Sequence, residues 1–187
     1  MSVSDNLKSQ IIQIHRQEGA PLASKLFIFE NTPPAKLKNA TNNYAPSLSN
    51  DETIVFLYDD TLGGSANDGF LLTNKQLYFK NYLEQSFLLD ISSIDNFTIK
   101  HGLLSSKMFV NKLDSSVLSI TITESNKNEK NGMLNVLNKS IELLKRAKPS
   151  SEIAGNQTAA RSANCRNCGA YILGNANNCE YCGSAIQ

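Results

Sequence analysis

The sequence predicts an α+β protein with helices at its N-terminal end, an antiparallel β-structure followed by a helix, and a small metal-binding module at the end. Three observations support this prediction. Apolar residues recur at helical spacing near the start of the chain and again before Pro149, short β-type runs fill the middle, and the four cysteines form two close pairs near the end. A chain of 187 residues has room for one ordinary domain with a small appended unit.

Two helices are predicted in the N-terminal part of the chain. In the first, the apolar residues lie three or four positions apart: Val3, Leu7, Ile11 and Ile14. Ser4 is available as its N-cap and Gly19 as its stop signal. The second helix is expected to end near Tyr44, with Thr32 as its cap and Pro33 in its first turn.

Seven short strands are predicted in the middle of the chain. The runs lie at residues 53–58, 69–73, 76–83, 87–91, 96–100, 107–112 and 117–123. In the last run Leu118, Ile120 and Ile122 alternate with Ser or Thr, which is the pattern of a strand with one wet face. Short polar connections between the runs favour an antiparallel meander that closes into a barrel or a sandwich.

One amphipathic helix is predicted after the strands. Its apolar face consists of Met133, Leu134, Leu137, Ile141 and Leu144. Basic residues at its C-terminal end complement the helix dipole, and Pro149 ends it.

The segment GFLLTNKQLYFKN, residues 69–81, resembles the second and third strands of bacterial PH-like and GRAM-like domains. The likeness extends over residues 51–147 through the number of strands and the helix that follows them. The resemblance implies a PH-like antiparallel β-barrel with its C-terminal helix closing one open end. Another small β-barrel with a terminal helix is the alternative.

The cysteines provide the most specific motif of the chain. Cys165-x-x-Cys168 and Cys179-x-x-Cys182 each place two sulfurs on one side of a metal, and a short hairpin can bring the two pairs together. Four thiolates at about 2.3 Å complete the tetrahedral shell of one structural Zn²⁺ per chain and leave no position open for water or substrate. The metal therefore indicates a structural or recognition role.

The pattern CxxCGAxI followed by CxxCG is similar to the short zinc ribbons of many bacterial and archaeal proteins. Arg166 and Glu180 depart from it, because such ribbons often have Pro at these positions. A redox dithiol, a rubredoxin-like iron site and a pair of disulfides are the alternatives. The chain thus divides into four predicted parts: an N-terminal helical region (1–50), a PH-like barrel with its helix (51–148), a polar linker (149–164) and a zinc ribbon (165–187).

No catalytic set is evident in the sequence. His15 and His101 are expected to be solvated surface residues. The glycine-rich stretch 63–69 lacks the Lys and Ser/Thr of a P-loop and is expected to be a flexible hairpin loop. Asp59 and Asp60, which precede it, are expected to face opposite sides and to keep the hairpin mouth soluble. We therefore expect a protein that is not an enzyme.

The charges favour protein partners over polyanions. The formal net charge is +1, from 18 basic and 17 acidic residues that interleave along the chain. Residues 59–69 contain no Lys or Arg, which disfavours phosphoinositide binding, and only Arg161 and Arg166 lie near the cysteines, which disfavours nucleic acid. We expect a cytoplasmic binding or adaptor protein. Nucleic-acid association through the ribbon and lipid binding through the barrel are the alternatives.

Overall fold

The computed structural model describes residues 4–18, 25–103, 105–123 and 126–147, together with the backbone of 163–164 and 171–172. The chain forms two compact units, Met1–Ala147 and Lys148–Gln187. The first unit is α+β, with antiparallel sheets and a helix after the strands. The predicted fold class is therefore confirmed at the level of the mixed class.

The first unit contains three α-helices and eight strands in its described residues. In chain order the elements are α1 (Asp5–Glu18), β1 (Leu26–Ile28), the 3-10 turn η1 (Phe29–Asn31), α2 (Pro34–Asn43), β2 (Ile54–Asp59), β3 (Gly69–Thr73), β4 (Gln76–Lys80), β5 (Ser86–Asp90), the 3-10 turn η2 (Ile91–Ser93), β6 (Ile94–Lys100), β7 (Ser106–Lys112), β8 (Val117–Ile122) and α3 (Lys127–Ala147). Strands β2 to β8 coincide with the seven predicted runs to within a few residues.

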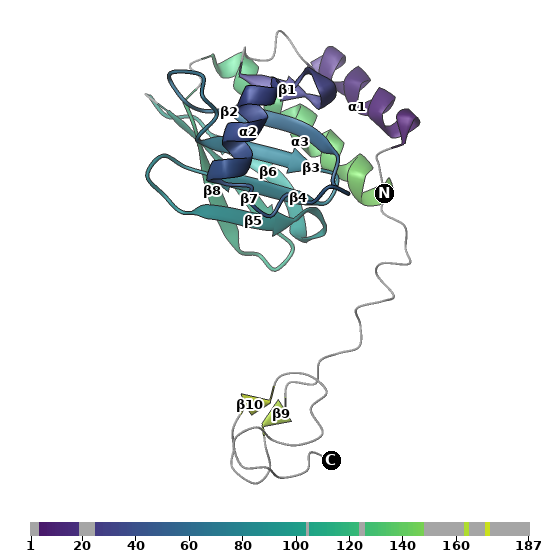
Figure 1. Ribbon diagram of the computed structural model, residues 1–187, viewed down its shortest axis with the longest axis vertical. Helices are drawn as coiled ribbons and strands as arrows, with labels where there is room; N and C mark the ends of the chain where they lie inside the picture. The colour runs from purple at the N-terminus through teal and green to yellow at the C-terminus, as the bar shows by residue number, and fades with distance from the viewer. Residues whose placement is uncertain are drawn as a thin grey trace. The chain divides into compact units, whose positions relative to one another are not determined.

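The strands form two antiparallel sheets. One has five strands in the order β1-β2-β3-β4-β5, and the other has three in the order β6-β7-β8. No backbone ladder joins the two sheets in the described part of the chain, so the hydrogen bonding does not form a continuous closed barrel. The two sheets instead pack face to face with α1 and α3 around the larger core, while α2 covers the outer face of the five-stranded sheet (Figure 1).

This layering explains why some strands are continuous apolar runs and others alternate between apolar and polar residues. Strand β3 is buried at every position and β2 at all but its first, because both faces of the five-stranded sheet are covered. Strand β7 alternates between buried and more exposed positions, because one face of the smaller sheet lies in the core. In β6 an irregularity between Ile94 and Asn96 separates the two buried residues, Ile94 and Phe97, by three positions.

Helix α3 packs into the larger core as its pattern predicts. Leu137 is fully buried and Ile141 is 1% exposed. The basic end of the helix also contacts the smaller sheet, since Lys145 donates from Nζ to the carbonyl oxygen of Ile94.

The N-terminal part differs from the prediction in two respects. Leu26–Ile28 forms β1, which pairs with β2 and so adds an edge strand to the first sheet. Ser4 accepts a hydrogen bond from Leu7 N at 3.3 Å as predicted, but Thr32 does not cap α2. Pro33 is the N-cap of that helix, without a side-chain hydrogen bond, and Pro34 begins it.

The second unit has two short strands in its described backbone. Strand β9 (Ala163–Asn164) pairs antiparallel with β10 (Tyr171–Ile172), with Asn164 opposite Tyr171. The pair brackets residues 165–170 in the sequence. All four cysteines lie outside the described residues, as does the predicted linker except for β9.

Candidate functional site

The loop between β2 and β3 is organised by a buried carboxylate. Asp59 is 1% exposed and forms an ion pair with Lys36 of α2 at 2.5 Å. Its Oδ1 accepts hydrogen bonds from Thr61 N at 3.0 Å and from Ala66 N at 3.1 Å. Lys36 also donates to the carbonyl oxygen of Gly64. The glycine-rich stretch is therefore a loop folded around Asp59, with hydrogen bonds that the sequence did not predict.

The end of this loop needs a glycine for steric reasons. Gly69 has a φ of 130° and begins β3 opposite Asp59. A Cβ atom there would lie 2.0 Å from the carbonyl oxygen of Tyr58. Only glycine allows β2 and β3 to approach so closely at the mouth of the hairpin.

Asp60 bonds in the opposite direction to Asp59 and reaches the end of β8. Its Oδ1 accepts from Thr123 N and from Thr123 Oγ1, both at 2.8 Å, and from the Tyr58 hydroxyl at 3.2 Å. The two neighbouring carboxylates do face opposite sides, as expected. Their role is different from the expected one, because each forms structural hydrogen bonds instead of serving only to keep the surface soluble.

A second side chain joins the sheets at the same place. Asn81, at the end of β4, is 8% exposed. Its Nδ2 donates to Ser119 O at 3.1 Å and its Oδ1 accepts from Thr121 N at 2.8 Å. The outer edge of β8 therefore bonds to side chains of the first sheet where a closed barrel would have a backbone ladder.

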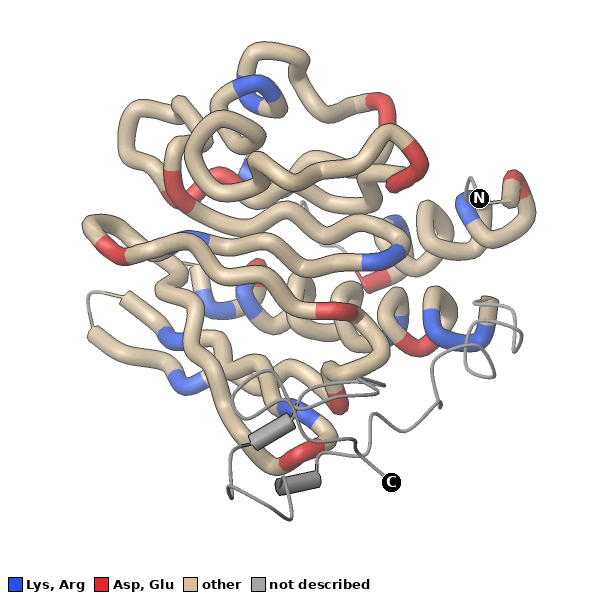
Figure 2. Tube along the Cα trace, turned by 60° about the horizontal axis from the view of Figure 1, so that its bottom comes forward, with Lys and Arg blue, Asp and Glu red and all other residues tan. Residues whose placement is uncertain are grey.

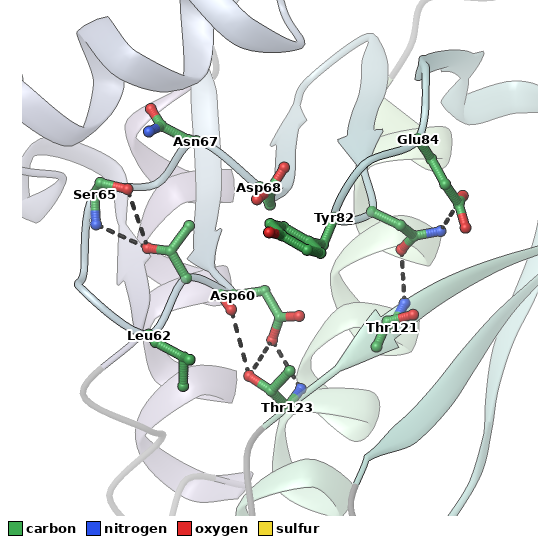
Figure 3. Close-up of a pocket in the computed structure, with 11 residues that line it drawn as sticks. Asp60, Leu62, Ser65, Asn67, Asp68, Tyr82, Glu84, Thr121 and Thr123 are labelled. Carbon is green, nitrogen blue, oxygen red and sulfur yellow. Dashed lines mark hydrogen bonds between the residues drawn. The ribbon is translucent and has the colours of Figure 1, made fainter.

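A pocket of about 550 Å³ lies at this junction (Figure 3). Its lining comprises three carboxylates, two amides, four hydroxyls and two large apolar side chains: Asp60, Asp68 and Glu84; Asn67 and Asn81; Thr61, Ser65, Thr121 and Thr123; Leu62 and Tyr82. Leu62 is 99% exposed and Tyr82 is 76% exposed, so the apolar side chains form the rim. In the view of Figure 3 the Tyr82 ring lies between Asp68 and Asp60.

The lining of the pocket is acidic, because it contains three carboxylates and no Lys or Arg. Two lysines border it: Lys80 beside Asp68, and Lys25, whose Nζ donates to Thr123 Oγ1 at 3.3 Å. Burial raises the pKa of Asp60 above its ordinary value, against the opposing effects of its hydrogen bonds from Thr123 and Tyr58 and of the nearby Lys25 cation. Asp68 has Lys80 at 3.4 Å, and Glu84 accepts a hydrogen bond from Asn81 at 2.8 Å. A cation entering the pocket would relieve the cost of keeping the Asp60 carboxylate ionised.

Neither a cluster of metal ligands in the described residues nor a histidine-based catalytic set in the lining of the pocket is present. The described residues contain no group of three or more His, Cys, Asp or Glu side chains placed to hold a metal ion. The pocket contains hydroxyls and carboxylates but neither histidine, so nothing in it matches a hydrolytic triad. The arrangement is suited to recognition of a ligand through charge and hydrogen bonds.

The two histidines are less exposed than the sequence suggested. His15 on α1 is half-buried, and burial, together with Arg16, lowers its pKa. His101 is also half-buried, and its Nε2 lies 3.0 Å from Asn131 Oδ1 on α3. Both residues lie apart from the lining of the pocket.

Charged residues of both signs are interspersed along the backbone of the first unit (Figure 2). The β2–β3 loop receives a single cation from α2, and that cation is already bound to Asp59 and to the loop backbone. Among the described helices, none is long and apolar enough to cross a membrane. No protein-family model, curated protein or solved structure matches the chain.

Proposed function

We propose that this protein is a non-enzymatic binding or adaptor protein that contacts protein partners, and that the pocket receives a Lys or Arg side chain. The observation that supports this most strongly is the lining itself. Three carboxylates surround a pocket with an exposed aromatic and aliphatic rim, which complements a cation on an aliphatic stem. The exposed Tyr82 offers an aromatic contact of the type that is enriched in protein interfaces, and Leu62 adds apolar surface beside the pocket.

The first unit is further proposed to be a PH-like domain. This resemblance implies four strands, then three strands, then a helix. The first unit has this order in β2 to β5, β6 to β8 and α3. Helices α1 and α2 and strand β1 would then be additions at the N-terminal side. Side-chain bonds from Asp60 and Asn81 would replace the ladder that closes the barrel.

The second unit is proposed to be a zinc ribbon with one structural Zn²⁺ held by Cys165, Cys168, Cys179 and Cys182. The pairing of β9 with β10 supports this, because it brings together the chain on either side of the first cysteine pair. Metal analysis of the purified protein should give about one zinc per chain. Iron, or two disulfides without metal, would contradict the proposal. A second surface on the ribbon and a cytoplasmic location complete the adaptor proposal.

The cation-binding role can be tested with a phage-displayed library of random dodecapeptides selected against the full chain. We expect Lys or Arg in the enriched peptides, and we expect binding to weaken about tenfold or more in Asp68→Asn with Glu84→Gln. The matched control is Asp114→Asn with Glu142→Gln, which changes the net charge equally at two exposed carboxylates outside the pocket.

The result that would overturn the proposal is a lack of selected peptides, or equal weakening by the two double variants. Equal weakening would mean that only the net charge of the chain matters. Salt-sensitive binding to DNA or to phosphoinositide vesicles in place of basic peptides would support the nucleic-acid or membrane alternative instead.

A further inference from the structure

Both outer edges of the three-stranded sheet are covered by side chains. On β8, Asn81 and Asp60 bond to the backbone as described above. On β6, Asn138 of α3 accepts from Phe97 N at 2.7 Å and donates to Phe97 O at 2.9 Å. These side chains occupy the positions that an added strand would need, so neither edge can easily accept one.

Strand β5 is an edge of the five-stranded sheet, and its outer side has no strand partner in the described chain. One backbone hydrogen bond just beyond β5 determines which N–H and C=O groups of the strand point toward β4 and which point outward. Ile91 N donates to Lys75 O at 2.9 Å, so this pair, which continues the β4–β5 register by one residue, occupies a hydrogen-bonded position of the antiparallel ladder. Because bonded and non-bonded pairs alternate, Leu89 and Phe87 bond toward β4. The N–H and C=O of Leu88 therefore point away from the sheet.

The same alternation of bonded and non-bonded pairs holds on β8, where the side chain that binds the outward backbone groups is known. Lys112 N donates to Ser116 O, which makes that pair a bonded one. Alternation from it turns the backbone groups of Ser119 and Thr121 outward. These are the groups that Asn81 binds. On β8, the alternation of bonded and non-bonded pairs thus agrees with the observed direction of the outward backbone groups.

Both faces of β5 carry apolar side chains that the fold leaves partly uncovered. Phe87 stacks on Phe79 with ring centroids 5.0 Å apart, yet remains 39% exposed. Leu88, opposite Tyr78 in the register, is 50% exposed on the other face. Half-exposed apolar side chains on both faces are what a strand shows when the neighbour that would cover them is absent.

The turn that leads into β5 adds a strained apolar residue. Leu83 is 85% exposed and has a φ of 60°, a conformation that favours Gly or Asn over a branched side chain. Tyr82 and Glu84 on either side of it line the acidic pocket. The open edge and the pocket therefore meet at this turn, which forms part of one continuous surface.

We infer that β5 accepts an extended segment of a partner protein as a sixth strand of the first sheet, and that a Lys or Arg of the same segment enters the pocket. This inference rests on the proposed cation-binding function. Every pairing in the sheet is antiparallel, and an antiparallel segment would run toward Glu84 with its C-terminal end. The recognised sequence is thus an apolar stretch followed by a basic residue. The acidic pocket provides the charge complementarity.

The test compares two edge prolines in the full chain. Leu88→Pro removes the outward N–H and places a ring against the incoming strand, without removing a bond to β4. Val117→Pro is the matched control, because Val117 is 53% exposed and its N–H also points outward, but from β8. The probes are the dodecapeptides selected on the wild type, prepared as synthetic peptides.

We expect Leu88→Pro to bind the selected peptides about tenfold or more weakly, and Val117→Pro and Leu88→Ala to retain most of the affinity. The selected peptides should carry the basic residue C-terminal to the apolar ones. Equal binding by Leu88→Pro and wild type would overturn the added strand. It would leave the cation-binding pocket intact if the pocket variants still weaken binding.

A measurement on the wild type keeps the inference testable even if Leu88→Pro does not fold. Hydrogen exchange of the Leu88 amide should slow about tenfold or more when peptide is added, because a backbone hydrogen bond then forms. Unchanged exchange with saturating peptide would contradict the added strand. A wild-type dimer by light scattering, with Leu88 already protected in the absence of peptide, would instead identify a second copy of this chain as the occupant and overturn the inference.

Replacing the strained turn residue separates folding from binding. Leu83→Gly relieves the positive φ, so the free energy of unfolding should stay the same or rise. Peptide affinity should fall about threefold or more, because the exposed side chain is lost from the contact surface. A variant that is less stable and binds normally would show that Leu83 serves the fold and not the partner.

Discussion

The two sheets of the first unit end in different ways. The three-stranded sheet has Asn138 against one edge and Asn81 with Asp60 against the other. The five-stranded sheet ends on one side in the short strand β1 and on the other in β5, which pairs with β4 and has no strand partner on its outer side in the described residues. An unpaired edge invites association with other chains, and proteins usually block it. Side chains therefore block both edges of the three-stranded sheet, whereas no strand covers the outer edge of β5, where we propose that a partner binds.

Hydrogen bonds from side chains cover less of an edge than a backbone ladder between two strands does. Asn81 and Asp60 bond to only a few backbone groups of β8, so the sheets are joined at one end without a continuous line of strand pairing. The space beside these bonds becomes the pocket. A closed ladder at the same place would have filled it with backbone.

The largest effect is expected from charging the core that both sheets share. Leu137→Asp should destabilise the first unit by about 4 kcal/mol or more, because a fully buried position would then hold an unpaired carboxylate. Chemical denaturation measures the change. Asn128→Asp, at an exposed position in the first turn of α3, should be nearly neutral. A soluble Leu137→Asp variant with normal stability would show that α3 is not part of the core.

Removing Asp59 should have the next largest effect. Asp59→Ala removes one of the two acceptors of the buried Ala66 N–H, the other being Thr61 Oγ1, and leaves Lys36 without its carboxylate, at a cost of about 2–4 kcal/mol. Asp51→Ala removes an exposed ion pair with Lys75 and should change the free energy of unfolding little. Similar losses in the two variants would contradict an organising role for Asp59 in the β2–β3 loop.

Removing the amide caps should have an intermediate effect and should open the closed edges. Asn81→Ala and Asn138→Ala should each cost about 1–2 kcal/mol, since each leaves a backbone N–H and a C=O without a partner. Exchange of the Thr121 amide in the first variant and of the Phe97 amide in the second should become faster. Unchanged exchange would mean that these side chains do not protect the edges.

The smallest effect is expected from the titration of Asp60. Its pKa is raised by burial, so the folded state binds a proton more tightly than the unfolded state does. The wild type should therefore gain stability relative to Asp60→Asn as the pH falls from 7 toward the ordinary pKa of Asp, about 4. The stability of the wild type and of Asp60→Asn is measured by chemical denaturation at each pH. The difference between the two proteins removes the contribution of the other carboxylates, which both share. A wild type that loses stability relative to the variant over this range would contradict the direction of the shift.

Much of the fold could be predicted from local patterns. Alternation in β8 and the apolar runs of β2 and β3 identified the strands, because burial on one or two faces leaves a direct record in the sequence. Strand β1 was missed because three residues are too few to show a period. Thr32 was misjudged because two prolines follow it, and the second begins the helix.

The pocket could not be predicted, because its partners are distant in the sequence. Asp59 pairs with Lys36, and Asp60 bonds to Thr123, so the purpose of the two carboxylates depends on the tertiary fold. One signal was present in the sequence. Adjacent carboxylates at the end of an apolar strand, followed by Thr61 and a glycine-rich loop, are typical of a loop folded around an acceptor. The cysteine site remains a prediction from spacing alone.

The most direct test of the contrast between the edges is site-resolved amide hydrogen exchange on the free wild-type protein. The amides of Phe97, Thr121 and Thr123 point outward from edge strands but bond to side chains, so they should exchange slowly. The outward amide of Leu88 should exchange at least about tenfold faster. Protection of Leu88 equal to that of the other three in the free monomer would contradict an open β5 edge.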